Sequence, residues 1–315
     1  MKIYLNRKPK TGPWGGGIKT VNKLVDKLED EDHEVVFDLQ PGIDIIFCID
    51  PRPNDIGEWY QNFLNYKSSF PGCKIIQRVG DLGTHSKPEL TRLVKQTLNL
   101  SDYFIFPSEW AKEWIGFTGE NCRVIHNAPM DVFHLHKNVE STITGKPKLI
   151  THHWSTNPKK GFHLYKQLDE HIQETGEFEF TYVGRLPEDI KLTNYKPPMG
   201  SQLVAKELQK NDIYITASIE EAGANHVLEA LAAGLPVVYH KDGGSINNYC
   251  HKYGEEYSSF EDMLKNIRRV IYHYRSYKEK LFKYIIDNDD IVKEYIEIIE
   301  EVCLEKTKDS SINNS

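Results

Sequence analysis

Strand and helix patterns alternate along almost all of the 315 residues, and this alternation constrains the fold more than any other feature. Short apolar runs such as 149–152 and 213–216 predict buried strands, and segments such as 162–172 carry the periodicity of helices between them. Strands that alternate with helices form parallel sheets covered by helices on both faces. The sequence therefore predicts an α/β protein built from doubly wound, Rossmann-like domains.

A polar stretch over 138–148, with Ser, Thr, Gly and Pro, has the composition of a linker and separates two alternating series of similar size. We expect a first Rossmann-like domain over 1–140 and a second over 146–290. A C-terminal helix over 291–306 should pack near the domain junction, and the polar tail 307–315 should be disordered. Such sheets bind ligands at the carboxyl ends of their strands, so two facing domains would enclose a cleft.

Composition narrows the class of partner. The formal net charge is -7, whereas nucleic-acid binding usually leaves a basic footprint, so a nucleic-acid partner is disfavoured. The chain begins with a strand-like run that lacks the apolar core of a signal peptide, and no apolar window reaches the length of a membrane span. The five cysteines are widely spaced and show no metal-ligand spacing, which favours reduced thiols and a cytoplasmic location.

The segment 212–250 holds the most informative constellation, a strand, a polar turn, a helix and a second strand. Glu221 and Glu229 are expected at the two ends of the helix, and eight helical steps between them would span about 12 Å. Gly223, Ala224 and Asn225 form the helix entrance, where backbone N–H groups and the helix dipole favour an anion. Glu229 lies in an apolar run and needs a polar partner, a role that a ribose diol would fill. The segment thus favours a nucleotide sugar.

Three other stretches follow predicted strands. The Gly-rich segment 12–17 could approach a phosphate closely, or it could be a flexible tight turn. Lys160, at the end of 151–161, could neutralise a diphosphate at a helix entrance, while the histidines before it could serve packing alone. Asp81 and His85 are acid–base groups after the fourth strand, although Asp81 could simply cap a turn.

The run EEAGANHVLEALAAGLPVV resembles the donor-site signature of glycosyltransferase family 4, retaining enzymes of the GT-B fold. GPWGGG, SDYFIFPSEW, VIHNAP and HHWSTNPKKG extend the resemblance over nearly the whole chain. The resemblance implies a GT-B architecture, two Rossmann-like doubly wound domains facing a cleft. It also implies a retaining glycosyltransferase, hexosyltransferase-like, that moves a sugar from a UDP- or GDP-linked donor to a glycan, lipid or small-molecule hydroxyl.

The resemblance implies that Glu221 contacts the sugar and the α-phosphate of the donor. It also implies that Glu229 binds the ribose hydroxyls and that Lys160 binds the diphosphate. The implied catalytic residues are Glu221, Lys160 and Asp81. The implied donor-binding residues are Gly16, Gly17, Ser155, Lys160, Gly184, Glu221, Gly223, Ala224, Asn225 and Glu229. No Asp-x-Asp motif follows a predicted strand, so we expect no metal ion and no cofactor beyond the donor.

The sequence departs from the family at two positions. Ser155 stands where the family usually carries Arg, and Gly80 stands where many members carry His; Arg78 and His153 are nearby groups that could replace them. Three alternatives therefore stay open. They are a sugar-nucleotide epimerase, a non-catalytic sugar-nucleotide-binding protein of the same fold, and an enzyme that glucosylates DNA bases.

Overall fold

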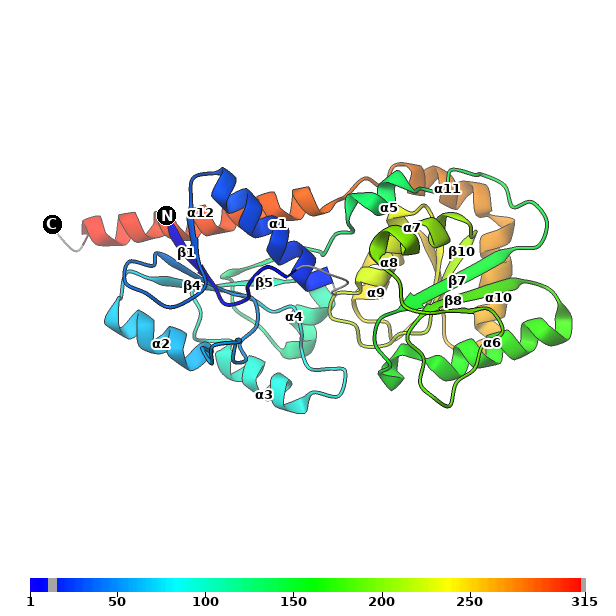
Figure 1. Cartoon of the computed structure of the whole chain (residues 1–315), viewed down its shortest axis with the longest axis horizontal. Coiled ribbons are helices and arrows are strands. Elements are labelled where there is room, and N and C mark those ends of the chain that lie inside the picture. The colour runs from blue at the N-terminus through cyan, green and yellow to red at the C-terminus, as the bar shows by residue number, and fades with distance from the viewer. Residues whose placement is uncertain (11–15, 313–315) are drawn as a thin grey trace. The chain divides into compact units, whose positions relative to one another are not determined.

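Two six-stranded parallel sheets form the framework of the chain (Figure 1). The computed structural model describes residues 1–10 and 16–312. One unit comprises 1–126 together with 288–315, and the other comprises 127–287. Residues 127–140, predicted to belong to the first domain, thus lie in the second unit, and the C-terminal helix belongs to the first.

In the first unit the strands follow the order β2-β1-β3-β4-β5-β6, and every neighbouring pair is parallel. The strands are β1 (Lys2–Leu5), β2 (Glu34–Val36), β3 (Ile45–Cys48), β4 (Lys74–Arg78), β5 (Tyr103–Phe106) and β6 (Cys122–Val124). The helices are α1 (Gly16–Asp30), α2 (Tyr60–Ser69), α3 (Pro88–Thr97), α4 (Glu109–Ile115) and α12 (Asn288–Ile312). This is the predicted doubly wound arrangement.

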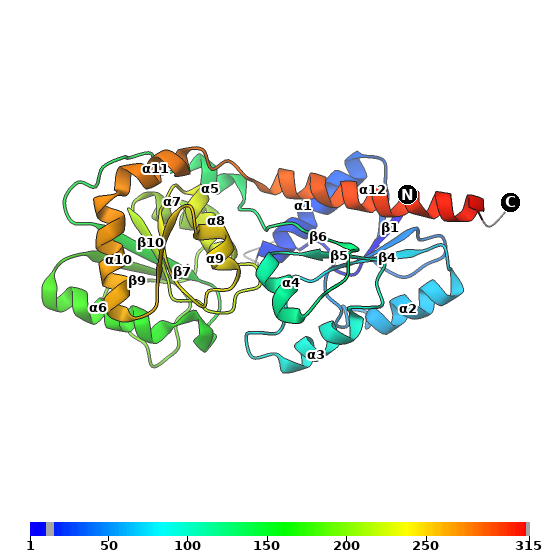
Figure 2. The same cartoon turned by 180° about the vertical axis from the view of Figure 1, so that it is seen from behind.

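Helices cover both faces of this sheet. Helices α1 and α12 lie on one face and α2 and α3 on the other, as the two opposite views show (Figures 1 and 2). Helix α12 packs against α1 and β4, since its apolar stripe is buried and the ring of Tyr295 lies 5.8 Å from that of Phe47. The helix continues to Ile312, into the segment predicted to be disordered. Ser108 caps α4, because its hydroxyl accepts from the N–H of Ala111.

The second unit repeats this design with the strand order β12-β11-β10-β7-β8-β9, again all parallel. Its strands are β7 (Lys148–His153), β8 (Glu179–Gly184), β9 (Tyr195–Lys196), β10 (Ile213–Thr216), β11 (Val237–His240) and β12 (Gly254–Tyr257). Its helices are α5 (Asp131–Leu135), the 3-10 turn η1 (Pro158–Lys160), α6 (Phe162–Thr175), α7 (Ser201–Gln209), α8 (Asn225–Ala232), α9 (Ser245–Cys250), α10 (Phe260–Tyr272) and α11 (Tyr274–Phe282).

Two apolar clusters sandwich this second sheet. Helices α7, α8 and α9 contribute to one cluster, and α6 and α10 contribute to the other. Helices α10 and α11 follow one another directly and are divided at His273. Strands β10 and β7 are neighbours in the centre of the sheet, so the loops that follow them emerge side by side at its carboxyl edge.

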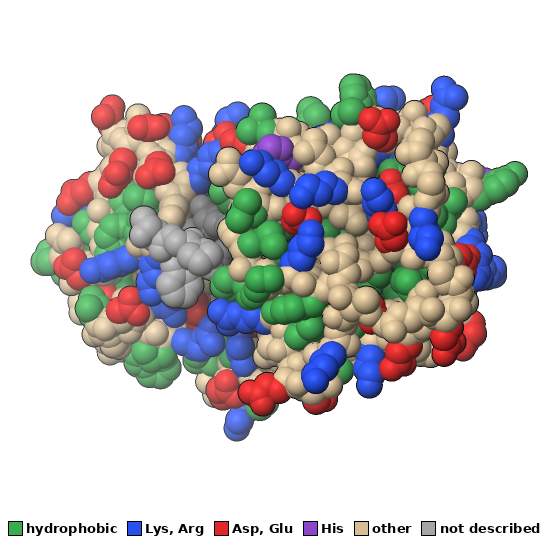
Figure 3. Space-filling view, turned by 45° about the vertical axis from the view of Figure 1, so that its right-hand side comes forward, with side chains coloured by type: hydrophobic (Ala, Val, Ile, Leu, Met, Phe, Trp, Pro, Cys, Tyr) green, Lys and Arg blue, Asp and Glu red, His purple; other side chains and the backbone are tan. Residues whose placement is uncertain are grey.

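On the face of the molecule seen in Figure 3, Lys and Arg side chains are interspersed with Asp and Glu. Among residues 1–10 and 16–312, no helix combines the length and the apolar character that crossing a membrane requires.

Candidate functional site

The site in the second unit is built from the loops that follow β7 and β10. The N–H of Ile219 donates to the carbonyl of Lys159 at 2.9 Å and joins the two loops. Gly161, with φ +76, allows this approach, since a Cβ there would come within 3.0 Å of the backbone carbon of Ala217. The two sequence-predicted segments are therefore brought together by the backbone itself.

Two consecutive ion pairs reinforce this junction. Lys159 pairs with Glu220, and Lys160 pairs with Glu221. The inner pair is the more buried, because the side chains of Lys160 and Glu221 are 11% and 12% exposed, against 31% and 37% for the outer pair. Glu220 adopts a positive φ of 52°, a conformation that non-glycine residues rarely use, and this turns the chain so that both carboxylates meet their lysines.

Glu221 lies outside the helix, in contrast to the prediction that the two acids occupy its two ends. Helix α8 begins only at Asn225. Glu221 instead forms a parallel bridge with Gly244, in which its N–H donates to Gly243 and its carbonyl accepts from Ser245. The sequence spacing fits a helix, but these bonds hold Glu221 in extended chain. The helical rise of about 12 Å therefore does not describe the separation of Glu221 and Glu229.

The entrance of α8 lies directly after this bridge. The hydroxyl of Ser245 accepts from the N–H of Ala224 at 3.0 Å, and the side-chain amide of Asn127 donates to the carbonyl of Gly223 at 3.3 Å. These bonds fix the backbone from Gly223 to Asn225 in front of the first helical turn. The positive end of the helix dipole at this entrance favours an anion.

Glu229 finds its polar partner within the protein. Its carboxylate lies 2.8 Å from Nε2 of His152, with side-chain exposures of 14% and 11%. The sequence predicted that this acid needs a polar partner. His152, at the end of β7, is that partner in the protein itself, without a bound ribose. Nδ1 of His152 is buried and has no hydrogen-bond partner among the residues that the structure describes.

Gly184 and Ser155 occupy the adjoining edge of the sheet. Gly184 ends β8 with a φ of +127°, and a Cβ there would lie 2.9 Å from the carbonyl carbon of His153. Ser155 is exposed, and its hydroxyl accepts from the N–H of Asn157. Both residues thus lie beside the loop that carries Lys160.

Arg185 is a basic residue at this edge that the sequence reasoning missed. Its guanidinium lies 4.6 Å from the centre of the Trp154 ring, next to Ser155, where the family usually has an arginine. Its N–H donates to the carbonyl of His153 at 3.1 Å, which fixes it to the end of β7. The sequence alone does not single out this arginine, because its contact with Trp154 joins the end of β8 to the end of β7.

In the first unit, Asp81 caps the turn after β4. One carboxylate oxygen accepts from the N–H of Gly83 at 2.9 Å, and the other accepts from Nζ of Lys87 at 2.7 Å. The turn-capping interpretation of Asp81 therefore describes its contacts, and its catalytic role stays a prediction. Gly16 and Gly17 open helix α1. Residues 12–15, the rest of the Gly-rich segment, lie outside the described part of the chain.

Comparisons with known proteins now give the fold its class. Pneumococcal O-GlcNAc transferase GtfA, solved with UDP and GlcNAc, matches with a TM-score of 0.58 at 15% identity, over 82% of this chain and 56% of GtfA. WaaG, a glycosyltransferase involved in lipopolysaccharide biosynthesis, matches with a TM-score of 0.65 at 13% identity, over 95% of this chain and 99% of WaaG. HepE from Anabaena, solved with UDP and glucose, matches with a TM-score of 0.61 at 14% identity, over 95% of this chain and 99% of HepE.

These structures establish that the chain has the GT-B fold, with two Rossmann-like units, as predicted. The chain spans only about half of the GtfA chain, 56% of its length. No protein-family model matches the sequence, and a search among curated proteins finds no match.

Proposed function

We propose that the protein is a retaining glycosyltransferase of family 4 that moves a sugar from a nucleoside diphosphate donor to a hydroxyl acceptor. The observation that carries the proposal is the buried pair of Lys160 and Glu221 at the carboxyl edge of a GT-B sheet. A lysine held at that edge, beside a helix entrance, suits a diphosphate. The UDP complexes of GtfA and HepE support a UDP-linked donor, and a GDP-linked donor is the alternative.

Each residue of the site receives a role in this proposal. Lys160 and the entrance of α8 would neutralise the diphosphate. Arg185 would supply the positive charge that an arginine supplies at the position of Ser155 in the resembled family. On donor binding, Lys160 would turn part of its hydrogen bonding from Glu221 to the phosphate, which leaves Glu221 able to accept from sugar hydroxyls. Glu229, oriented by His152, would accept from the ribose hydroxyls.

The chemistry needs no protein nucleophile. The bond between the sugar C1 and the phosphate oxygen breaks while the acceptor oxygen bonds C1 on the same face, and the departing phosphate takes the acceptor's proton. Negative charge grows on the leaving diphosphate, so cations fixed near it stabilise the transition state more than the ground state. We propose metal-independent transfer because no Asp-x-Asp motif follows a predicted strand.

A donor screen on the full chain tests the proposal. UDP, GDP and their sugar conjugates are added singly, and the melting temperature is recorded, since a bound ligand raises it by mass action. We expect a rise with one nucleotide series and at least a tenfold loss of affinity in Arg185→Gln. The control is Arg275→Gln, which removes an arginine that is 81% exposed on α11 and pairs with Glu279 of the same helix. No response at millimolar concentration to any nucleotide would contradict the proposal.

A non-catalytic sugar-nucleotide-binding protein is the second candidate, because the carboxylate of Asp81 is already engaged by Gly83 and Lys87. Product analysis separates the two functions. Donor that binds but is neither hydrolysed nor transferred would favour the binding protein, and so would hydrolysis and transfer that are unchanged in Glu221→Ala. A free, altered sugar nucleotide without a glycosylated acceptor would indicate an epimerase instead.

A further inference from the structure

A cavity of 460 Å³ in the second unit lies at the amino-terminal edge of its sheet. Its lining comes from the segment 137–141 ahead of β7, from Gly234 ahead of β11 and from the end of α11. The side-chain amide of Asn138 donates to the carbonyl of Asn211, just ahead of β10, at 2.7 Å and ties the first segment to this edge. The volume lies within the range of about 300–1,000 Å³ that is typical of small-molecule sites. The candidate donor site lies at the opposite, carboxyl edge, so the cavity is a separate site.

Lys278 places a buried positive charge in the cavity wall. It is 6% exposed, and its Nζ donates to the carbonyls of Asn138 and Gly234, each at 2.6 Å, and to Oδ1 of Asn138 at 3.3 Å. All three acceptors are neutral, and Lys278 forms no ion pair with any residue in the described part of the chain. Burial lowers its pKa from 10.5 to about 8, the direction expected of an ammonium that lacks a close counter-charge.

Lys137 places a second ammonium on the same cavity. Its Nζ donates to the carbonyls of Leu281 at 3.2 Å and Tyr284 at 2.7 Å, at the C-terminal end of α11. An ammonium has three N–H donors, so one remains after these two bonds. Lys137 likewise forms no ion pair within the described residues, and burial lowers its pKa. The acid of the lining, Glu279, is 67% exposed and pairs with Arg275 at 3.2 Å.

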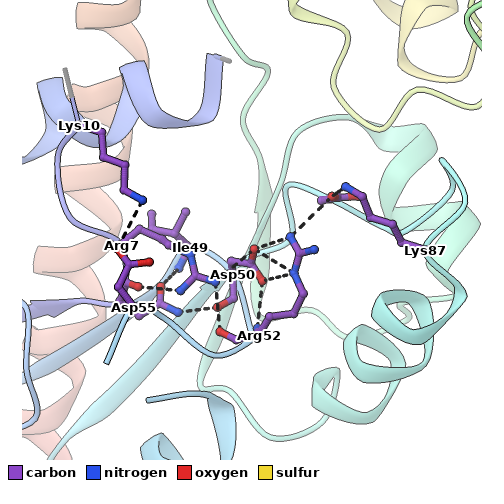
Figure 4. A network of polar contacts seen from close by, with 9 residues as sticks. Arg7, Lys10, Ile49, Asp50, Arg52, Asp55 and Lys87 are labelled. Carbon is purple, nitrogen blue, oxygen red and sulfur yellow. Dashed lines mark hydrogen bonds and ion pairs between the residues drawn. The ribbon is translucent and has the colours of Figure 1, made fainter. Parts of the chain in front are cut away.

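Other charged groups of the chain show what these two lysines lack. Lys160, with a similar exposure of 9%, pairs with Glu221. In the first unit, Asp50 binds Arg52 at 2.6 Å and Arg7 at 3.3 Å, as Figure 4 shows. A poorly solvated charge without an ion partner costs free energy. An anion that enters the cavity would offset this cost for both of its lysines.

We propose that this cavity binds the phosphate group of a small phosphomonoester. A phosphate carries nearly two negative charges at neutral pH and so matches two ammonium groups, whereas a carboxylate matches one. Lys137 supplies a directed hydrogen bond through its third N–H, and Lys278 supplies a fixed charge. Phe282 and Val139, 70% and 67% exposed, also line the cavity and give the organic part of the ester an apolar surface. The inference does not depend on the proposed glycosyltransferase function.

Isothermal titration of the full chain, at constant ionic strength in chloride, tests the inference. The probes are phenyl phosphate, benzoate and phenol, which share a ring and differ in charge. We expect phenyl phosphate to saturate with a Kd below about 10 mM, benzoate to bind more weakly and phenol not to saturate. No saturation by phenyl phosphate, or equal binding of phenyl phosphate and either of the other probes, overturns the proposal.

Inorganic phosphate is the fourth probe, and it separates an ester from free phosphate. Weaker binding than that of phenyl phosphate supports the ester, because the ring then contributes through Phe282 and Val139. Binding as tight as that of phenyl phosphate would assign the cavity to free phosphate and overturn the ester.

Three variants, each of which removes one positive charge, locate the binding. Lys137→Gln should weaken phenyl phosphate about tenfold, the loss of one charge-assisted hydrogen bond. Lys265→Gln, on the exposed side of α10 and outside the lining, and Arg185→Gln, at the donor edge, should leave it unchanged. An equal loss in Lys137→Gln and Lys265→Gln would mean that only net charge matters. A loss in Arg185→Gln alone would place the probe at the donor edge. Either result refutes the proposal.

Proton uptake gives a second readout that involves Lys278 itself. Phenyl phosphate, with a second pKa of about 6, is a dianion at pH 8. A dianion bound nearby raises the pKa of Lys278, so the wild type should take up a fraction of a proton at pH 8. Titrations in two buffers of different ionisation enthalpy measure this uptake. The other charged groups around Lys278 are Lys137, Glu140, Asp212, Glu279 and Lys283.

Lys278→Met isolates the contribution of Lys278 from that of these neighbours. The variant should show less proton uptake than the wild type at the same saturation. Equal uptake would mean that the anion binds away from Lys278, and the proposal fails. If Lys278→Met does not fold, the comparison of Lys137→Gln with Lys265→Gln decides by itself.

Discussion

The guanidinium of Arg78 occupies the space that a side chain at Gly80 would fill. A Cβ at Gly80 would lie 2.9 Å from Cζ of Arg78 and closer still to Nη1. Arg78 is buried and bonded to Tyr295, so it has little freedom to move aside. The glycine at position 80, a departure from the histidine common in the resembled family, is thereby coupled to the arginine two residues earlier.

We expect Gly80→Ala to push the Arg78 guanidinium out of position and to lower the free energy of unfolding by about 1–2 kcal/mol, through overpacking and the lost bond to Tyr295. Urea unfolding with an unchanged m value measures the difference. Gly200→Ala is the control, because no atom in the described part of the chain lies within 4 Å of a Cβ there and φ is -68°. That change should stay within about 0.5 kcal/mol. Equal stabilities of the two variants would refute the coupling.

The inner ion pair should contribute more than the outer one. Lys160→Met or Glu221→Gln leaves the partner with a poorly solvated charge, so each should cost about 2–4 kcal/mol. A double-mutant cycle should give a coupling of about 1–3 kcal/mol. The same cycle on Lys159→Met and Glu220→Gln should give about 0–1 kcal/mol, because that pair is three times as exposed. Equal coupling in both cycles would show that burial does not distinguish the pairs.

Gly184 should tolerate no side chain. Its φ of +127° and the adjacent carbonyl of His153 leave no space for a Cβ, so Gly184→Ala should cost about 3 kcal/mol or more. Gly176→Ala is the matched control. It has a φ of +66°, but among the described residues a Cβ would meet no atom closer than Nζ of Lys146 at 3.8 Å, so strain alone should cost about 1 kcal/mol. Thermal unfolding of both variants compares them, and a smaller loss at Gly184 would contradict the steric argument.

The strands were predictable where apolar runs are short, unbroken and central. The predicted span 213–216 coincides with β10, and 149–152 lies within β7, since burial on both faces favours apolar residues. Strand β12 escaped prediction because it is an edge strand with the sequence Gly-Glu-Glu-Tyr. An edge strand whose two central residues are glutamates carries no apolar signal.

The candidate site was predictable in its residues but not in its contacts. Lys160, Glu221 and Glu229 stand out by position in the pattern, yet the bonds of Glu229 to His152 and of Lys160 to Glu221 join residues 77 and 61 positions apart. Only the packing of β7 beside β10 creates them. Arg185 illustrates the same limit, because its relation to Ser155 depends on its contact with Trp154.

Lys278 provides a prediction on pH. It is 6% exposed, and its Nζ donates to the carbonyls of Asn138 and Gly234, each at 2.6 Å. Burial lowers its pKa from 10.5 to about 8. The folded state therefore releases this proton before the unfolded state does. Between about pH 8 and 10.5 the unfolded chain binds more protons, so the contribution of Lys278 to the free energy of unfolding rises with pH, by at most about 1.4 kcal/mol per unit.

Below about pH 8 both states hold the proton and Lys278 adds no slope. The free energy of unfolding is measured from pH 7 to 10 for the wild type, Lys278→Met and Lys265→Met. Lys265 is an exposed lysine of α10 and serves as the control for the lost charge. The free energy of unfolding of the wild type should increase relative to that of Lys278→Met as pH rises above 8. The difference between the wild type and Lys265→Met should not change with pH. A constant difference from Lys278→Met would mean that the ammonium's bonds to the two carbonyls offset the effect of burial on its pKa.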